Sequence, residues 1–137
     1  MLLLDIKCEK YSLPNGLEII LHKNNSFPLV AVNLWYKVGS AQEKKGKTGL
    51  AHLFEHMMFQ QSENVGQDQF FKKIQAAGGT LNGGTNSDGT MYYEVVPKNA
   101  LELALWLESS PAPSGSSGTG TAGRSLPAGF CLWRFWA

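Results

Sequence analysis

The chain has 137 residues, of which 43% are hydrophobic, and its net charge is +1. This composition is typical of a globular domain with a real core and argues against a disordered chain. The small charge gives no reason to expect a nucleic acid or an anionic membrane as a partner. No stretch approaches the length of a transmembrane segment, and the three leucines before Asp5 are too few for a signal peptide. We therefore expect a cytoplasmic protein, or a periplasmic or organellar one if its true start lies upstream.

The first predicted elements are extended. Short strands are expected at residues 11–13 and 17–22, because Pro14-Asn15-Gly16 between them is a strong turn signal. Residues 30–38 alternate between apolar side chains and others, which predicts a strand with one buried face. A polar loop at 39–46 follows, and Thr48 is the expected N-cap of a helix through about residue 60.

The second part of the pattern repeats strands and helices. A helix is predicted at 68–77, ended by Gly78-Gly79, and a hairpin follows at 80–85 and 90–96. Asn99 is the expected cap of a last helix. This order predicts an α+β fold, an α/β layer in which a mostly antiparallel sheet packs with helices.

The composition changes after Glu108. All lysines and all acidic residues lie at or before this position, and both arginines lie after it. Residues 109–129 are almost wholly Ser, Gly, Pro, Ala and Thr, which cannot bury enough apolar surface to offset the entropy of ordering. We therefore predict a domain at 1–108 and a low-complexity tail at 109–137 that is either disordered or an out-of-frame addition.

The helix predicted at 48–60 contains the sequence GLAHLFEHMMF. His52 and His56 stand one turn apart on one face and can both bind one Zn²⁺. Glu55 flanks that face, where a carboxylate can take a proton from a zinc-bound water. Apolar residues on the other faces predict a buried helix. Because HxxEH also recurs by chance, the spacing alone leaves open a zinc site and an ordinary helix face.

Longer segments carry a family resemblance. TGLAHLFEHMMF resembles the inverted zinc motif of the pitrilysin/insulinase metallopeptidases. LPNGLEIILHKN resembles the opening hairpin of that family, VAVNLWYKVGSAQEKKGKTGLAH its next strand and loop, and AAGGTLNGGTNSDGTMYYEVVP the hairpin after the motif. The resemblance covers residues 9–108 and implies the N-terminal part of a pitrilysin-like or mitochondrial-processing-peptidase-like domain.

The resemblance also implies roles for particular residues. His52 and His56 match two zinc ligands, and Glu55 matches the general base. Asn82 and Gly83 match a substrate-binding pair that is commonly Asn-Ala in the family. The implied activity is that of a zinc-dependent metalloendopeptidase, and the implied partners are a peptide or protein substrate and a second peptidase half or partner subunit.

The C-terminal part departs from this pattern. The third zinc ligand of the family is a glutamate on a later helix, which would fall near residues 131–133, and no acidic residue follows Glu108. Cys131 stands in the wrong context to replace it. We therefore expect the chain as written to be an inactive fragment of a peptidase. One alternative is a non-catalytic binding or scaffold subunit of a processing-peptidase-like assembly; another is an unrelated helical metal-binding or structural protein.

Overall fold

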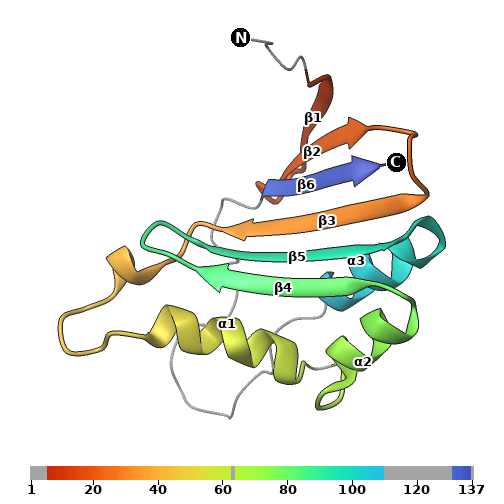
Figure 1. Cartoon of the computed structure of the whole chain (residues 1–137). Helices are drawn as coiled ribbons and strands as arrows, with labels where there is room; N and C mark the ends of the chain where they lie inside the picture. Colours follow the sequence, from red (N-terminus) through yellow and green to blue (C-terminus); the bar gives the residue numbers. More distant parts are fainter. Residues whose placement is uncertain (1–5, 63, 110–130, 137) are drawn as a thin grey trace, which may run out of the picture.

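The computed structural model describes residues 6–62, 64–109 and 131–136. The elements in chain order are β1 (Cys8–Ser12), β2 (Glu18–Lys23), β3 (Leu29–Tyr36), the 3₁₀ helix η1 (Ser40–Gln42), α1 (Leu50–Gln60), α2 (Gln69–Ala76), β4 (Thr80–Thr85), β5 (Thr90–Pro97), η2 (Lys98–Ala100), α3 (Leu101–Ser109) and β6 (Cys131–Trp136). The strands form one sheet in the order β1-β2-β6-β3-β5-β4 (Figure 1). Among the described strands, only β2 and β6 pair in parallel. The predicted α+β fold with a mostly antiparallel sheet is confirmed.

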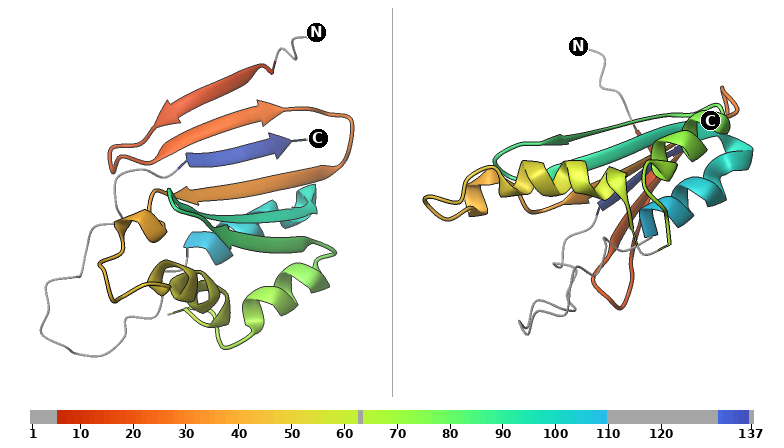
Figure 2. Two further views of the ribbon diagram at one scale, coloured as in Figure 1. Left: turned by 60° about the vertical axis from the view of Figure 1, so that its left-hand side comes forward. Right: turned by 90° about the horizontal axis from the view of Figure 1, so that it is seen from below.

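The helices gather beside the β3–β5–β4 half of the sheet, while the β1–β2 hairpin extends beyond them (Figures 1 and 2). α1 contacts β4 and β5, and α3 contacts β3 and β5. Alternate residues of β3 are buried, namely Val30, Val32 and Leu34, as the alternating pattern predicted. The buried side chains of this half form the core, whereas every residue of β1 is exposed.

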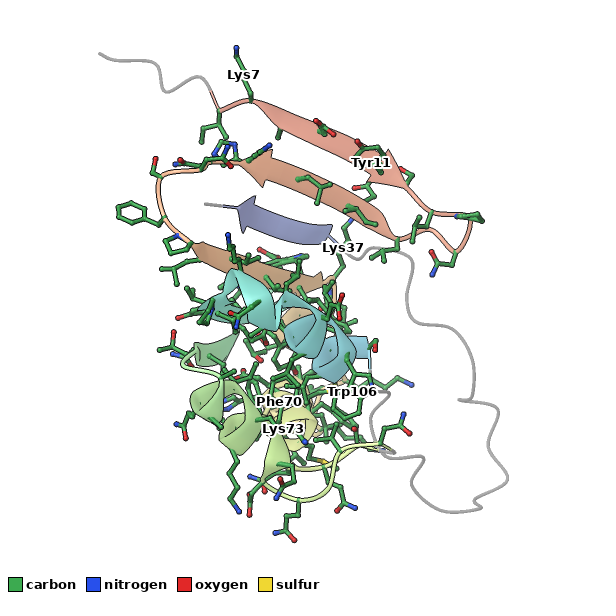
Figure 3. All side chains as sticks on the ribbon, turned by 90° about the vertical axis from the view of Figure 1, so that its right-hand side faces the viewer. Lys7, Tyr11, Lys37, Phe70, Lys73 and Trp106 are labelled. Atoms are coloured by element: carbon green, nitrogen blue, oxygen red, sulfur yellow. The ribbon has the colours of Figure 1, made fainter. Side chains whose placement is uncertain are left out.

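An aromatic cluster joins α1 and α2 to the sheet. The ring centroid of Phe59 lies 5.5 Å from that of Phe70 and 5.3 Å from that of Tyr92, both in edge-to-face geometry. Where α2 meets α3, the Lys73 ammonium lies 5.9 Å from the centroid of the Trp106 ring (Figure 3). Tyr11, on β1, lies far from this contact. Among the described residues, no helix is long and apolar enough to cross a membrane.

The N-terminus of α1 is capped differently from the prediction. The helix begins at Leu50, and Gly49 before it has a left-handed φ of 90°. The carboxylate of Glu43 accepts hydrogen bonds from the backbone N–H groups of Ala51 and Gly49, each at 2.8 Å. These two bonds lower the pKa of Glu43. The prediction of Thr48 as the cap was wrong, because a carboxylate from the preceding loop reaches the free N–H groups first.

One other prediction was wrong, and one stays untested. Asn99 lies inside η2 and does not cap α3, which begins at Leu101. The predicted tail at 109–137 falls mostly outside the described residues, but Cys131–Trp136 forms β6, six residues long, between β2 and β3. The prediction of a disordered or out-of-frame tail after residue 108 therefore stays a prediction.

One buried carboxyl group has no partner of good geometry. Glu94, on β5, is 0% exposed, and neither of its side-chain oxygens has a hydrogen bond within the described ranges. Its carboxyl group interacts with that of Glu108, a half-buried residue on α3. Burial, and then Glu108, raise the pKa of Glu94 from 4.5 to about 11. Burial also raises the pKa of Glu108. Burial therefore favours the protonated, neutral form of Glu94.

Candidate functional site

The histidines of α1 lie together on its exposed side. The Nε2 atoms of His52 and His56 are 3.1 Å apart, and their ring centroids are 4.6 Å apart. Both residues are exposed to solvent. The four-residue spacing on a helix produces this arrangement directly, because it places one side chain above the other.

This pair fits a single zinc ion. Histidine nitrogens bind Zn²⁺ at about 2.0–2.1 Å, so two nitrogens at the observed separation can both reach one tetrahedral ion. Within the described residues, however, no third His, Cys, Asp or Glu joins them in a group that could hold a metal, Glu55 included. The structure thus supplies two ligands of a site. The side chain of Cys131 lies outside what is described.

Glu55 is buried, whereas the neighbouring histidines are exposed. It is only 6% exposed, and its Oε2 accepts a hydrogen bond from the hydroxyl of Thr85 at the end of β4. The Thr85 and Thr90 hydroxyl oxygens are 3.2 Å apart, and the Thr90 hydroxyl donates to the carbonyl of Val38 at 3.0 Å. This chain of hydroxyl groups fixes the carboxylate against the sheet.

The burial of α1 differs from the prediction. Only Ala51, Glu55 and Phe59 are buried, and they form one stripe with a four-residue spacing. Apolar residues elsewhere on the helix are 41–59% exposed, namely Leu50, Leu53, Phe54 and Met57. The prediction of a helix buried nearly all round was wrong, since the sheet covers a single face of it.

β4, which carries Asn82 and Gly83, forms one edge of the sheet and lies alongside α1 (Figure 1). Asn82 is exposed, and its Oδ1 accepts a hydrogen bond from the backbone N–H of Gly83 at 2.8 Å. A Cβ atom added to Gly83 would lie 3.1 Å from Cε2 of Phe59. The strand and the histidine-bearing helix therefore pack as one unit.

Thr85 is a site residue that the sequence analysis did not single out. A hydroxyl at the end of a strand has no distinctive pattern. Its position directly opposite Thr90 across β4 and β5 could have indicated a hydroxyl pair, but only the packing of α1 brings Glu55 to it.

Residues 18–108 match the family described as Insulinase (Peptidase family M16). The chain belongs to this family. Among insulinase-family relatives, it is 34% identical to the Zinc protease PqqE of Helicobacter pylori over 102 residues, which are 74% of this chain and 23% of that protein. It is 33% identical to the Mitochondrial-processing peptidase subunit beta of Blastocladiella emersonii over 87 residues, covering 64% of this chain and 19% of that one.

Solved structures share the fold of this chain. A protease from Helicobacter pylori superposes with a TM-score of 0.71 at 33% identity, covering 74% of this chain and 24% of that one. Pitrilysin superposes with a TM-score of 0.71 at 25% identity, covering 77% and 11%. The chain therefore spans about a quarter or less of the relatives that it matches.

Proposed function

We propose that this chain supplies the metal-binding helix and the substrate strand of a zinc-dependent metalloendopeptidase. The observation that supports the proposal most is the 3.1 Å separation of the His52 and His56 Nε2 atoms on α1, one turn from a carboxylate fixed to the sheet edge. Burying a carboxyl group costs free energy, so a buried Glu55 beside two paired histidines is more typical of a functional site than of an ordinary helix face.

Each residue has an assigned role. His52 and His56 would hold the zinc ion through Nε2, with neutral imidazoles. Zinc, when bound, supplies a Lewis acid that lowers the pKa of a water ligand. Glu55 accepts a proton from the attacking water and passes it to the leaving amine. Because Thr85 donates to Oε2 of Glu55, we assign the proton to Oε1. Thr85 is thus a positioning residue.

The substrate would lie along β4. An edge strand has unpaired backbone groups to which an extended peptide can add as a further strand, and this pairing fixes its backbone. Asn82 and Gly83 lie on that edge, next to α1. A peptide added there would lie beside α1, the helix that carries the histidines.

The remaining zinc ligand must come from elsewhere. Two histidines hold zinc weakly, and the relatives that this chain matches are several times longer. We propose that the third ligand and the rest of the substrate cleft come from a further part of the peptidase or from a partner subunit. By itself, the chain would bind zinc weakly and cleave peptides poorly or not at all.

The test is zinc titration of the folded chain, followed by calorimetry or metal analysis. Three variants are compared: His52→Ala, His56→Ala and His22→Ala. His22 lies on β2, away from α1, and is the matched control. We expect weak binding of one ion that is lost in the first two variants and retained in the control. Absence of zinc binding by well-folded protein, or equal loss in all three, contradicts the proposal and favours a non-catalytic scaffold. Tight binding with peptide cleavage abolished by Glu55→Gln would instead refute the need for a further ligand.

A further inference from the structure

The pair Asn82–Gly83 combines features that favour a chemical change of its own. Asn82 is exposed on the edge strand β4. The backbone nitrogen of Gly83 lies 2.8 Å from Oδ1 of the Asn82 side chain. This hydrogen bond, donated by the Gly83 N–H, places the backbone nitrogen beside the side-chain amide whose Cγ is the electrophile. Holding two reacting groups next to each other accelerates the reaction between them.

We propose that Asn82 is a site of spontaneous deamidation. The backbone nitrogen of Gly83 loses its proton and attacks Cγ of Asn82. A C–N bond forms, the bond from Cγ to the side-chain nitrogen breaks, and that nitrogen takes up a proton and leaves as ammonia. The product is a five-membered succinimide. Water then adds to either of its carbonyl carbons and opens the ring, which gives aspartate or isoaspartate. No oxidant or reductant takes part, and water is the only co-reactant.

Glycine at position 83 is what permits ring closure. A Cβ atom on the attacking residue would hinder the approach of its nitrogen to Cγ, and glycine has none. Packing explains why glycine is present, since a Cβ there would lie 3.1 Å from Cε2 of Phe59 and 3.3 Å from the carbonyl oxygen of Met91. Because α1 packs closely on β4, position 83 is a glycine, and this glycine makes the side-chain amide of Asn82 chemically labile. At the edge, β4 pairs with β5 alone, so local opening breaks a single ladder.

The chain contains a second Asn-Gly pair that serves as an internal reference. At Asn15–Gly16, the backbone nitrogen of Gly16 donates to the carbonyl oxygen of Leu13 at 2.9 Å. The Oδ1 atom of Asn15 accepts from the backbone nitrogen of Leu17 at 3.1 Å. The two reacting groups are therefore each held by other atoms, and we expect Asn15 to react more slowly than Asn82 in the folded protein.

The two products change the site in different ways. Aspartate adds a negative charge to the edge of β4. Isoaspartate also adds a backbone atom, which shifts the register of β4 on β5 beyond residue 82. Thr85, which donates to Glu55, lies within the shifted part. Deamidation thus loosens the carboxylate from the sheet.

The experiment follows both Asn-Gly pairs by peptide mapping. The purified chain is incubated in mildly alkaline heavy-oxygen water, both folded and unfolded in urea, and digested for mass spectrometry. Incorporated heavy oxygen marks each deamidated residue, and an isoaspartyl methyltransferase reports isoaspartate. In the folded chain we expect several-fold more modification at Asn82 than at Asn15, and similar amounts at the two sites in urea. Gly83→Ala should reduce the deamidation of Asn82 several-fold. Gly84→Ala is the control: an added Cβ at Gly84 would meet open space, and this variant should not reduce the deamidation.

Two results would overturn the inference: an Asn82 that stays intact in the folded chain while Asn15 reacts, or an unchanged rate in Gly83→Ala. The folded wild-type measurement decides the matter even if Gly83→Ala fails to fold. The reaction needs neither zinc nor peptidase activity, so its outcome is independent of the zinc titration proposed above.

Discussion

The buried carboxyl group of Glu94 predicts an unusual dependence of stability on pH. We consider the substitution Glu94→Gln, which keeps the size of the side chain and removes its titration. In the wild type, the folded carboxyl group keeps its proton while the unfolded one loses it above its ordinary pKa of 4.5. A raised folded pKa means that the stability contributed by this proton is present at low pH and is lost as the pH rises.

The magnitude follows from the proton count. One proton bound in the folded state and none in the unfolded state changes the free energy of unfolding by about 1.4 kcal/mol per pH unit. Between about pH 5 and pH 7, the wild type should therefore lose about 3 kcal/mol that the variant does not lose. Glu94 is 0% exposed, so solvent screening does not reduce this figure. The loss continues toward the folded pKa of about 11.

Urea unfolding of both proteins across this pH range, followed by tryptophan fluorescence, measures the difference. The control is Glu102→Gln, since Glu102 is exposed on the same helix as Glu108 and should leave the pH dependence unchanged. The reasoning would be refuted if the free energies of unfolding of the wild type and Glu94→Gln changed in parallel over the whole pH range. A wild type that gains stability as the pH rises would also refute it.

Three further predictions concern the packing around α1. Glu43→Gln should lower the midpoint of thermal unfolding at neutral pH. The difference from the wild type should vanish as the pH falls through the lowered pKa of Glu43, because the wild-type carboxylate then loses its charge. A difference between the two midpoints that stays constant with pH in thermal scans would contradict this. Thr85→Val should cost about 1–3 kcal/mol of unfolding free energy in urea, because buried Glu55 loses its donor, whereas Thr85→Ser should cost little. Gly83→Ala should also cost about 1–3 kcal/mol by overpacking, and a double-mutant cycle with Phe59→Leu should show that the two sites are coupled.

Local sequence determined much of this protein. The alternation of residues 30–38 predicted β3 with its buried Val30 and Val32, and turn residues predicted both hairpins. The HxxEH spacing predicted the pairing of His52 with His56, because helical geometry alone places residues four apart on one face. These features depend on residues close together in the chain and can therefore be predicted from the sequence without a tertiary structure.

Contacts between distant residues had to come from the tertiary structure. Glu43 caps α1 in place of Thr48, Thr85 holds Glu55, and Phe59 fills the space beside Gly83. The apolar faces of α1 predicted full burial, but the sheet covers only one of them, so Phe54 and its neighbours stay exposed. Likewise, composition could not show that Cys131–Trp136 pairs with β2 and β3. Sequence fixes which residues share a helix face or a strand; the packing of helix on sheet decides which of those faces meets a partner, because that choice depends on chain segments far apart in sequence.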